Sequence, residues 1–147
     1  MQSEAVLLAK KKTGLGAGKW NGYGGKVEPG ENIKDATIRE LYEESGLIAK
    51  AEDLKQVGLL HLYFEGILKH ECSVYLLNVW EGTPTESTEM HAPRWYTLYH
   101  LPFGELWAAD PIWLPLVLNG QSLNASIYFN HDGSKVEDFK YHPTAFI

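Results

Sequence analysis

Three glutamates close together in one predicted helix constrain this chain more than any other feature. Glu40, Glu43 and Glu44 are spaced three and four residues apart. Because an α-helix turns about 100° per residue, this spacing places all three carboxylates on one helix face, where like charges repel. They also lie toward the helix C-terminus, whose dipole disfavours anions by roughly 0.3–1 kcal/mol each. The pattern indicates either a solvated acidic face or a divalent cation that offsets the repulsion.

The helix that carries these glutamates is predicted to span Lys34–Ser45. Asn32 is a suitable N-cap residue, and Asp35, three positions later, forms a variant of the capping box. Gly46 is suited to the left-handed conformation that ends many helices. The sequence therefore predicts both ends of this helix.

The residues around the helix narrow the interpretation. The chain has Gly25, five residues, Glu31, seven residues, and then Arg39-Glu40-Leu41-Tyr42-Glu43-Glu44-Ser45-Gly46-Leu47. This segment resembles the Nudix box, G-x5-E-x7-R-E-U-x-E-E-x-G-U, in which U is a bulky apolar residue, at every specified position. A chance match at so many fixed spacings is very improbable, so the chain is identified as a member of the Nudix family.

The resemblance implies a fold and a metal site. Nudix proteins belong to the α/β class and fold as an α/β/α sandwich with a mixed β-sheet and a loop–helix–loop catalytic motif. They hydrolyse nucleoside diphosphates linked to another group. In the family, the glutamates that match Glu40, Glu43 and Glu44 bind Mg²⁺, together with the backbone carbonyl at the position of Gly25. Mn²⁺ can substitute for Mg²⁺.

The resemblance also suggests individual roles. We expect Glu43 to be an indispensable metal ligand and Glu40 to be either a ligand or the general base. Glu89 matches a further catalytic or metal-binding glutamate of the family. Arg39 precedes Glu43 by four residues, so it can pair with that carboxylate and orient it. Arg39 and Glu31 would together support the helix and its loop electrostatically.

The chemistry of phosphoanhydride cleavage agrees with this assignment. Positioned metal ions neutralise charge on the phosphate oxygens, and a metal or a carboxylate base makes a water nucleophilic. The chain contains only two arginines, Arg39 and Arg94. Because bidentate arginine clamps on phosphates are therefore scarce, lysines, backbone N–H groups or metal ions must meet the phosphate charge.

The likeness extends beyond the box to the MutT-type members of the family, which degrade oxidised purine nucleoside triphosphates. Residues 11–26, 82–87 and 106–116 carry it. It implies that Asn21, Trp107 and Asp110 recognise the base, with Trp107 stacking on the purine. Lys11 and Leu15 are expected to contribute to substrate binding. From the residues alone, a tryptophan among Leu106, Trp113 and Leu114 is more often a core side chain than a stacking platform.

One position departs from this branch of the family. Ala109 stands where these relatives have the first of two adjacent aspartates, and Asp110 matches the second. Paired carboxylates can share a proton and so adjust to different base edges. A single carboxylate is therefore expected to alter the choice between 8-oxoguanine and 2-hydroxyadenine.

We therefore expect a Mg²⁺-dependent pyrophosphohydrolase of (deoxy)nucleoside triphosphates that prefers an oxidised purine such as 8-oxo-dGTP. The products would be the nucleoside monophosphate and pyrophosphate. One alternative is a hydrolase of nucleotide sugars, dinucleoside polyphosphates or capped RNA. Another is a nucleotide-binding Nudix module without catalysis, which the intact glutamate cluster argues against.

Composition sets the remaining expectations. The 147 residues fit one domain, 1–147, and the formal net charge of −6 argues against nucleic-acid binding. Cys72 is the only cysteine, so neither an intramolecular disulfide nor a cysteine-based zinc site can form. No apolar run approaches the roughly 20 residues of a membrane span. We expect a cytoplasmic monomer.

The other elements follow from apolar patterning and turn residues. Strands are predicted at residues 5–9, 22–27, 57–64, 73–79, 94–98, 126–129 and 136–141. The strand at 73–79 is mostly apolar and is expected to be buried on both faces. Pro102–Leu118 is expected to be partly helical, and Asp132-Gly133 indicates a hairpin.

Overall fold

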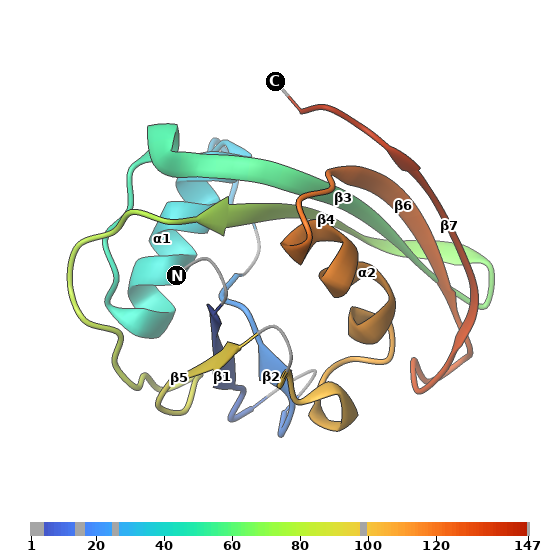
Figure 1. Cartoon of the computed structure of the whole chain (residues 1–147), viewed down its shortest axis with the longest axis horizontal. Coiled ribbons are helices and arrows are strands. Elements are labelled where there is room, and N and C mark those ends of the chain that lie inside the picture. The colour runs from blue at the N-terminus through green and yellow to red at the C-terminus, as the bar shows by residue number, and fades with distance from the viewer. Residues whose placement is uncertain (1–4, 14–16, 25–26, 98–99, 147) are drawn as a thin grey trace. The chain divides into compact units, whose positions relative to one another are not determined.

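The computed structural model describes residues 5–13, 17–24, 27–97 and 100–146 (Figure 1). It divides the chain into two compact units, and each unit contains two stretches of sequence. The first unit comprises the described parts of Met1–Leu54 and Leu77–Leu106, and the second comprises those of Lys55–Leu76 and Trp107–Ile147. A single domain over 1–147 stays a prediction.

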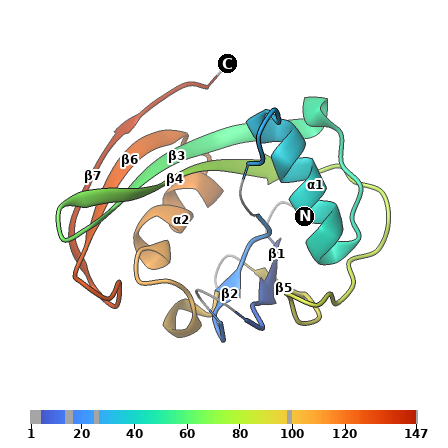
Figure 2. The same cartoon turned by 180° about the vertical axis from the view of Figure 1, so that it is seen from behind.

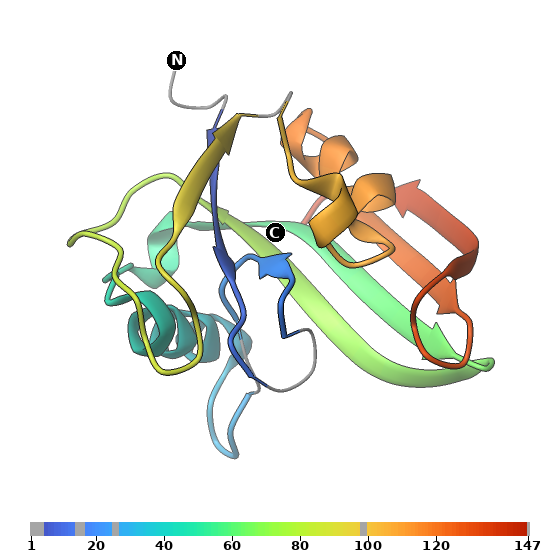
Figure 3. The same ribbon diagram turned by 90° about the horizontal axis from the view of Figure 1, so that it is seen from below.

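The first unit contains a three-stranded sheet and the helix of the acidic motif. Its elements are β1 (Ala5–Lys10), β2 (Trp20–Asn21), α1 (Ile33–Ser45), β5 (Arg94–Thr97) and two short 3-10 helices, Ala51–Asp53 and Phe103–Glu105. The strand order is β2-β1-β5, and β1 runs antiparallel to both neighbours (Figure 3). A small core of Leu41, Leu47 and Ala49 packs with Leu7 and Trp80, which fixes α1 through its apolar face.

The second unit contains a mixed sheet covered by one helix. Its elements are β3 (Leu54–Phe64), β4 (Ile67–Leu77), α2 (Asp110–Leu118), β6 (Leu123–Phe129) and β7 (Val136–Pro143). The first residue of β3 and the last residue of β4 are assigned to the first unit. The strand order is β4-β3-β6-β7. Strands β3 and β6 are parallel and β6 and β7 antiparallel, so the prediction of a mixed sheet is confirmed.

The core of the second unit follows the period of a strand. Leu123, Ala125, Ile127 and Phe129 alternate along β6 and are all buried on one face of the sheet. Helix α2 lies against this face and contributes Val117 to the same core (Figures 1 and 2). The apolar residues of α2 thus fix the segment that starts at Asp110.

The ends of α1 are as predicted. Asn32 has an extended backbone, and its side-chain oxygen accepts a hydrogen bond from the Asp35 N–H at 2.8 Å. The Asp35 carboxylate accepts a hydrogen bond from the Asn32 side-chain amide at 2.9 Å. In the usual capping box this second bond comes from the backbone N–H of the N-cap residue, whereas here it joins two side chains. Gly46 ends the helix with φ 80°, and its N–H donates to the Tyr42 carbonyl.

Replacing Gly46 with alanine is expected to destabilise the fold by about 1–2 kcal/mol, because the left-handed backbone disfavours a side chain. The added Cβ would also lie 3.2 Å from the Thr85 hydroxyl oxygen. Urea unfolding of both proteins measures the change. Gly104→Ala is the matched control, since a Cβ there meets nothing within 4 Å. Equal losses at both positions would contradict the prediction.

One predicted strand was wrong, and another is present with different bounds and without the burial expected on both faces. In place of a strand over 22–27, the structure has β2 at Trp20–Asn21, while Gly22–Gly24 are not in a strand and residues 25–26 lie outside the described residues. The strand predicted at 73–79 is the 11-residue β4, and none of its residues is buried. Glu65 and Gly66, both with positive φ, reverse the chain before β4. The strand begins at Ile67, and its first six residues, Ile67–Cys72, are exposed and do not alternate between apolar and polar side chains.

The other predicted helices and strands are present. Residues 102–118 contain a 3-10 helix and α2, the predicted strand at 94–98 is β5 up to Thr97, and a hairpin joins β6 to β7 around Gly133. Of the described residues, no helix combines the length and the apolarity needed to cross a membrane.

Candidate active site

Glu44 is the centre of the candidate site. It lies in the last turn of α1 and is only 4% exposed. The backbone N–H of Gly24 donates to its Oε1 at 2.9 Å, which joins the segment after β2 to the helix. Burial raises the pKa of this carboxyl to about 7, and the neighbouring carboxyls of Glu89 and Glu40 add to the increase.

Glu89 reaches Glu44 because its loop is fixed at two points. Near the start of the loop, the Thr85 N–H and hydroxyl both donate to the Ser45 carbonyl, at 2.8 and 3.1 Å. Near its end, the Glu89 carbonyl accepts from the Lys12 N–H at 2.8 Å. The loop thereby places a carboxylate from a distant part of the sequence close enough to the C-terminal turn of α1 to raise the pKa of Glu44.

Arg39 offsets the charge of the other glutamates. Its Nε and Nη2 atoms donate to both carboxylate oxygens of Glu31, at 2.9 and 3.1 Å. Its Nη1 donates to Glu40 at 3.0 Å and to Glu43 at 3.2 and 3.3 Å. The pairing predicted between Arg39 and Glu43 is therefore present. Glu44 has no salt bridge among the described side chains and remains the least compensated carboxylate of the motif.

The donor set suits a hard divalent cation. Carboxylate oxygens are the ligands that Mg²⁺ prefers, and Mg²⁺ usually keeps several waters. The buried hydroxyl oxygen of Tyr23, also in this unit, has no hydrogen-bond partner among the described residues. No three acidic, histidine or cysteine side chains within the described ranges form a ready-made metal cage. A bound cation would therefore draw Glu40 and Glu43 away from Arg39.

The residues expected to bind substrate fall in both units. In the first unit, the Asn21 side-chain amide donates to the Lys19 carbonyl at 3.0 Å, and the Lys11 N–H donates to the same carbonyl. Leu15 and Gly25 lie outside the described residues.

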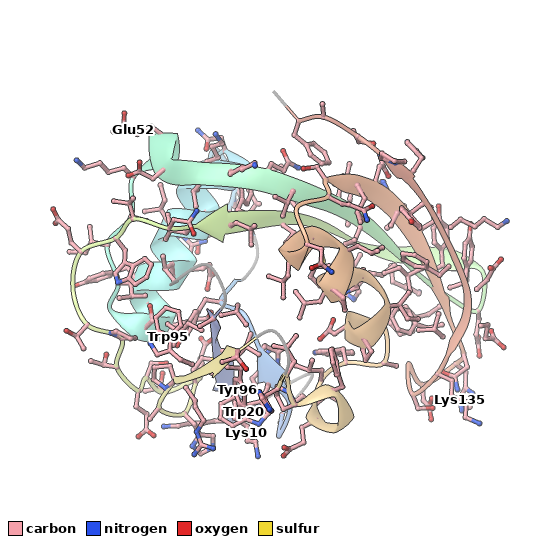
Figure 4. All side chains as sticks on the ribbon, viewed as in Figure 1. Lys10, Trp20, Glu52, Trp95, Tyr96 and Lys135 are labelled. Carbon is pink, nitrogen blue, oxygen red and sulfur yellow. The ribbon has the colours of Figure 1, made fainter. Side chains whose placement is uncertain are left out.

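Strand β2 is held by the residue before Asn21. Trp20 is buried, and its ring lies edge-on to Tyr96 with 5.2 Å between the centroids (Figure 4). The cationic groups of Lys10 and Arg94 lie over the same ring at 5.4 and 5.7 Å from its centroid. These contacts fix the backbone that presents Asn21.

Trp107 and Asp110 come together at the start of α2 in the second unit. The Asp110 carboxylate accepts a hydrogen bond from the Trp107 N–H at 3.1 Å and from the Trp113 indole N–H at 3.0 Å. Ala109 is 3% exposed and belongs to the core of this unit. Asp110 is thus held rigidly by two tryptophans, whereas its neighbour packs inward.

Sequence reasoning missed two contributors to the site, Tyr23 and Gly24. The backbone N–H of Gly24 binds Glu44, and Tyr23 places its hydroxyl where the charge of Glu44 acts on it. The run Trp20-Asn21-Gly22-Tyr23-Gly24 directly before the motif contains the signal. Glycines beside an acidic motif allow the backbone to approach a carboxylate closely.

Comparison with known proteins gives consistent matches. The NUDIX domain profile matches residues 1–117. The oxidized purine nucleoside triphosphate hydrolase of Mus musculus is 46% identical over 121 residues, which cover 80% of this chain and 74% of that protein. The protein of the same name from Danio rerio is 41% identical over 137 residues, which cover 92% and 85% of the two chains. A MutT protein structure from Bacillus halodurans matches the fold with a TM-score of 0.74 at 24% identity, covering 94% of this chain and 90% of that one.

Proposed function

The chain belongs to the NUDIX domain family, and on that basis we propose that it is a Mg²⁺-dependent pyrophosphohydrolase of nucleoside triphosphates with an oxidised purine, such as 8-oxo-dGTP. The products are the nucleoside monophosphate and pyrophosphate. The observation that carries the proposal is the buried carboxylate of Glu44, which lies beside Glu40 and Glu89 without a cationic partner among the described residues. The names of the mouse and zebrafish relatives support the choice of substrate.

Glu40, Glu43, Glu44 and Glu89 are the residues that would hold the metal, and Glu43, the ligand expected to be indispensable, would have to leave Arg39 to do so. A role for the Gly25 carbonyl stays a prediction. When bound, the metal supplies positive charge for the phosphate oxygens and lowers the pKa of a bound water.

The protein's own groups would orient this site. The Gly24 N–H fixes one oxygen of Glu44, so the other oxygen is aimed consistently. The bidentate contact between Arg39 and Glu31 ties α1 to the loop before it. A general base must be a carboxylate close to the attacking water, and Glu40 is the proposed candidate, as either the base or a metal ligand.

Asp110 is proposed to recognise the base by hydrogen bonding, and Trp107 to stack on the purine. Asn21, Lys11 and Leu15 are proposed as the other residues that bind substrate. One Asp110 oxygen accepts a hydrogen bond from the Trp107 N–H and the other accepts one from the Trp113 indole N–H, so the carboxylate is held in a fixed orientation. An ionised carboxylate only accepts hydrogen bonds, so it favours a purine edge that presents N–H donors. Guanine-type and adenine-type bases both present such donors, so the single carboxylate is proposed to alter the choice between 8-oxoguanine and 2-hydroxyadenine, because Ala109 supplies no second carboxylate.

A substrate panel tests this function. The protein is incubated with Mg²⁺ and 8-oxo-dGTP, dGTP, 2-hydroxy-dATP, ADP-ribose or a dinucleoside polyphosphate, and the products are separated by ion-exchange chromatography. We expect 8-oxo-dGTP to give the highest kcat/KM, with pyrophosphate released and all turnover lost in EDTA. Faster turnover of ADP-ribose than of any triphosphate would refute the proposed substrate.

Monomeric state and cytoplasmic location stay predictions from the sequence. Gel filtration with light scattering tests the first of them. Any oligomer found there would add a subunit contact without altering the residues proposed for the metal site.

A further inference from the structure

Tyr23 contains a buried oxygen atom that the proposed mechanism does not use. Its ring packs against the small core of Leu41, Leu47 and Ala49. Its hydroxyl oxygen is closed off from solvent, and it makes no hydrogen bond within the described part of the chain. Buried polar atoms are almost always paired, and an ordered water commonly supplies the missing partner.

Glu44, in turn, lacks hydrogen-bond donors. One carboxylate can accept about four hydrogen bonds, yet the backbone N–H of Gly24 is its only donor from an uncharged group of the described residues. Its other contacts are with the carboxyls of Glu89 and Glu40, which repel it when ionised. A buried carboxylate needs a further donor once the neighbouring carboxyls are ionised or engaged with a cation.

The two groups are linked through the residue that follows Tyr23. The backbone N–H of Gly24 donates to Glu44 at 2.9 Å, and the charge of Glu44 acts on the Tyr23 hydroxyl, which can donate a hydrogen bond. Because no direct bond joins the two side chains, one bridging water would satisfy both of them.

We propose that Tyr23 is a positioning residue whose hydroxyl holds a water molecule against the Glu44 carboxylate and thereby fixes that carboxylate for metal binding. Tyr23 acts through Glu44 and does not touch the substrate. The effect on turnover rests on the proposed function, whereas the effect on metal affinity does not.

The variant Tyr23→Phe keeps the ring and removes only the hydroxyl. Groups that orient a metal ligand typically contribute 10–100-fold to metal affinity. We therefore expect the Kd for Mn²⁺, measured by electron paramagnetic resonance of the free ion, to rise roughly tenfold. We expect kcat for 8-oxo-dGTP to fall by about the same factor while KM stays within roughly twofold, because the nucleotide contacts are unchanged.

Tyr42→Phe is the matched control. Tyr42 lies on α1 with its side chain 58% exposed, and it should bind Mn²⁺ and turn over substrate as the unmodified protein does. A simply unpaired hydroxyl gives the opposite result: Tyr23→Phe would melt at a higher temperature without metal and keep its Mn²⁺ affinity and kcat. That result would overturn the proposal. If the unmodified protein hydrolyses no nucleotide and Tyr23→Phe still weakens Mn²⁺ binding, the positioning role stands and the proposed function fails.

Discussion

Replacing Glu44 with glutamine is expected to lower kcat for 8-oxo-dGTP by roughly 10³-fold or more and at the same time to stabilise the metal-free protein. The loss of activity follows from removing the negative charge that would hold the cation against the phosphates. The gain in stability follows from the burial of that charge beside Glu40 and Glu89 with no cation to pair with it. Glutamine keeps an oxygen that can accept from the Gly24 N–H.

The stability gain should depend on pH. The pKa of Glu44 rises from an ordinary 4.5 to about 7 in the folded protein, so between these values the folded state binds more protons than the unfolded state. Stability of the metal-free protein therefore falls as the pH rises from about 4.5 to 7, and it levels off above 7. Glutamine does not titrate, so its advantage grows over the same range to at most about 3 kcal/mol.

Urea unfolding in EDTA at pH 5 and pH 8 measures this difference. Glu52→Gln is the matched control, because Glu52 is exposed in the 3-10 helix Ala51–Asp53 and its loss should change neither quantity. Adding Mg²⁺ should raise the stability of the unmodified protein at pH 8 and leave Glu44→Gln almost unchanged. A variant that is less stable than the unmodified protein at pH 8, or that retains turnover, would contradict the assignment.

Local patterns explain what the sequence predicted well. Asn32 and Gly46 mark the ends of α1 because each satisfies a backbone requirement that few other residues meet. The Nudix box predicted the family and the α/β fold, both of which the comparisons confirm. The start of strand β4 was missed because its exposed first half opens with Ile67 and Leu68 and continues with polar residues, so it does not alternate between apolar and polar side chains.

Contacts between distant segments explain what the sequence did not reveal. The spacing of Glu40, Glu43 and Glu44 predicts a shared helix face and gives no hint that Glu44 alone is buried. Its burial depends on Gly24 and on the loop that ends at Glu89. Only the tertiary fold brings these two segments to the helix. Sequence similarity suggested Glu89 as a site residue, and only the structure brings it to Glu44.

The way the charges of the motif are compensated also differs from what the sequence led us to expect. Repulsion among the three glutamates was expected to require a cation throughout. Arg39 already compensates Glu40 and Glu43 while it holds Glu31, so the uncompensated charge is concentrated at Glu44. A single arginine therefore assigns different roles to carboxylates that look equivalent in the sequence.

Replacing Arg39 with alanine is accordingly expected to lower kcat by roughly 10²-fold, because displacement of a catalytic group by about 1 Å can have this effect. Glu31 would lose its bidentate partner, and Glu40 and Glu43 would repel each other and Glu44. The metal-free protein should melt at a lower temperature than the unmodified protein, and the difference should shrink when Mg²⁺ is added.

Arg39→Lys separates charge from geometry in the same experiment. Lysine keeps the positive charge but cannot bind both oxygens of Glu31 while it also contacts Glu40. We expect its melting temperature without metal to lie between those of the alanine variant and the unmodified protein, and its kcat to lie nearer the alanine variant. Lys34→Ala, at an exposed position of the same helix, controls for loss of charge alone. If Arg39→Lys is as active as the unmodified protein, the role of Arg39 is charge compensation, and the bidentate contact that ties the loop to α1 is dispensable for catalysis.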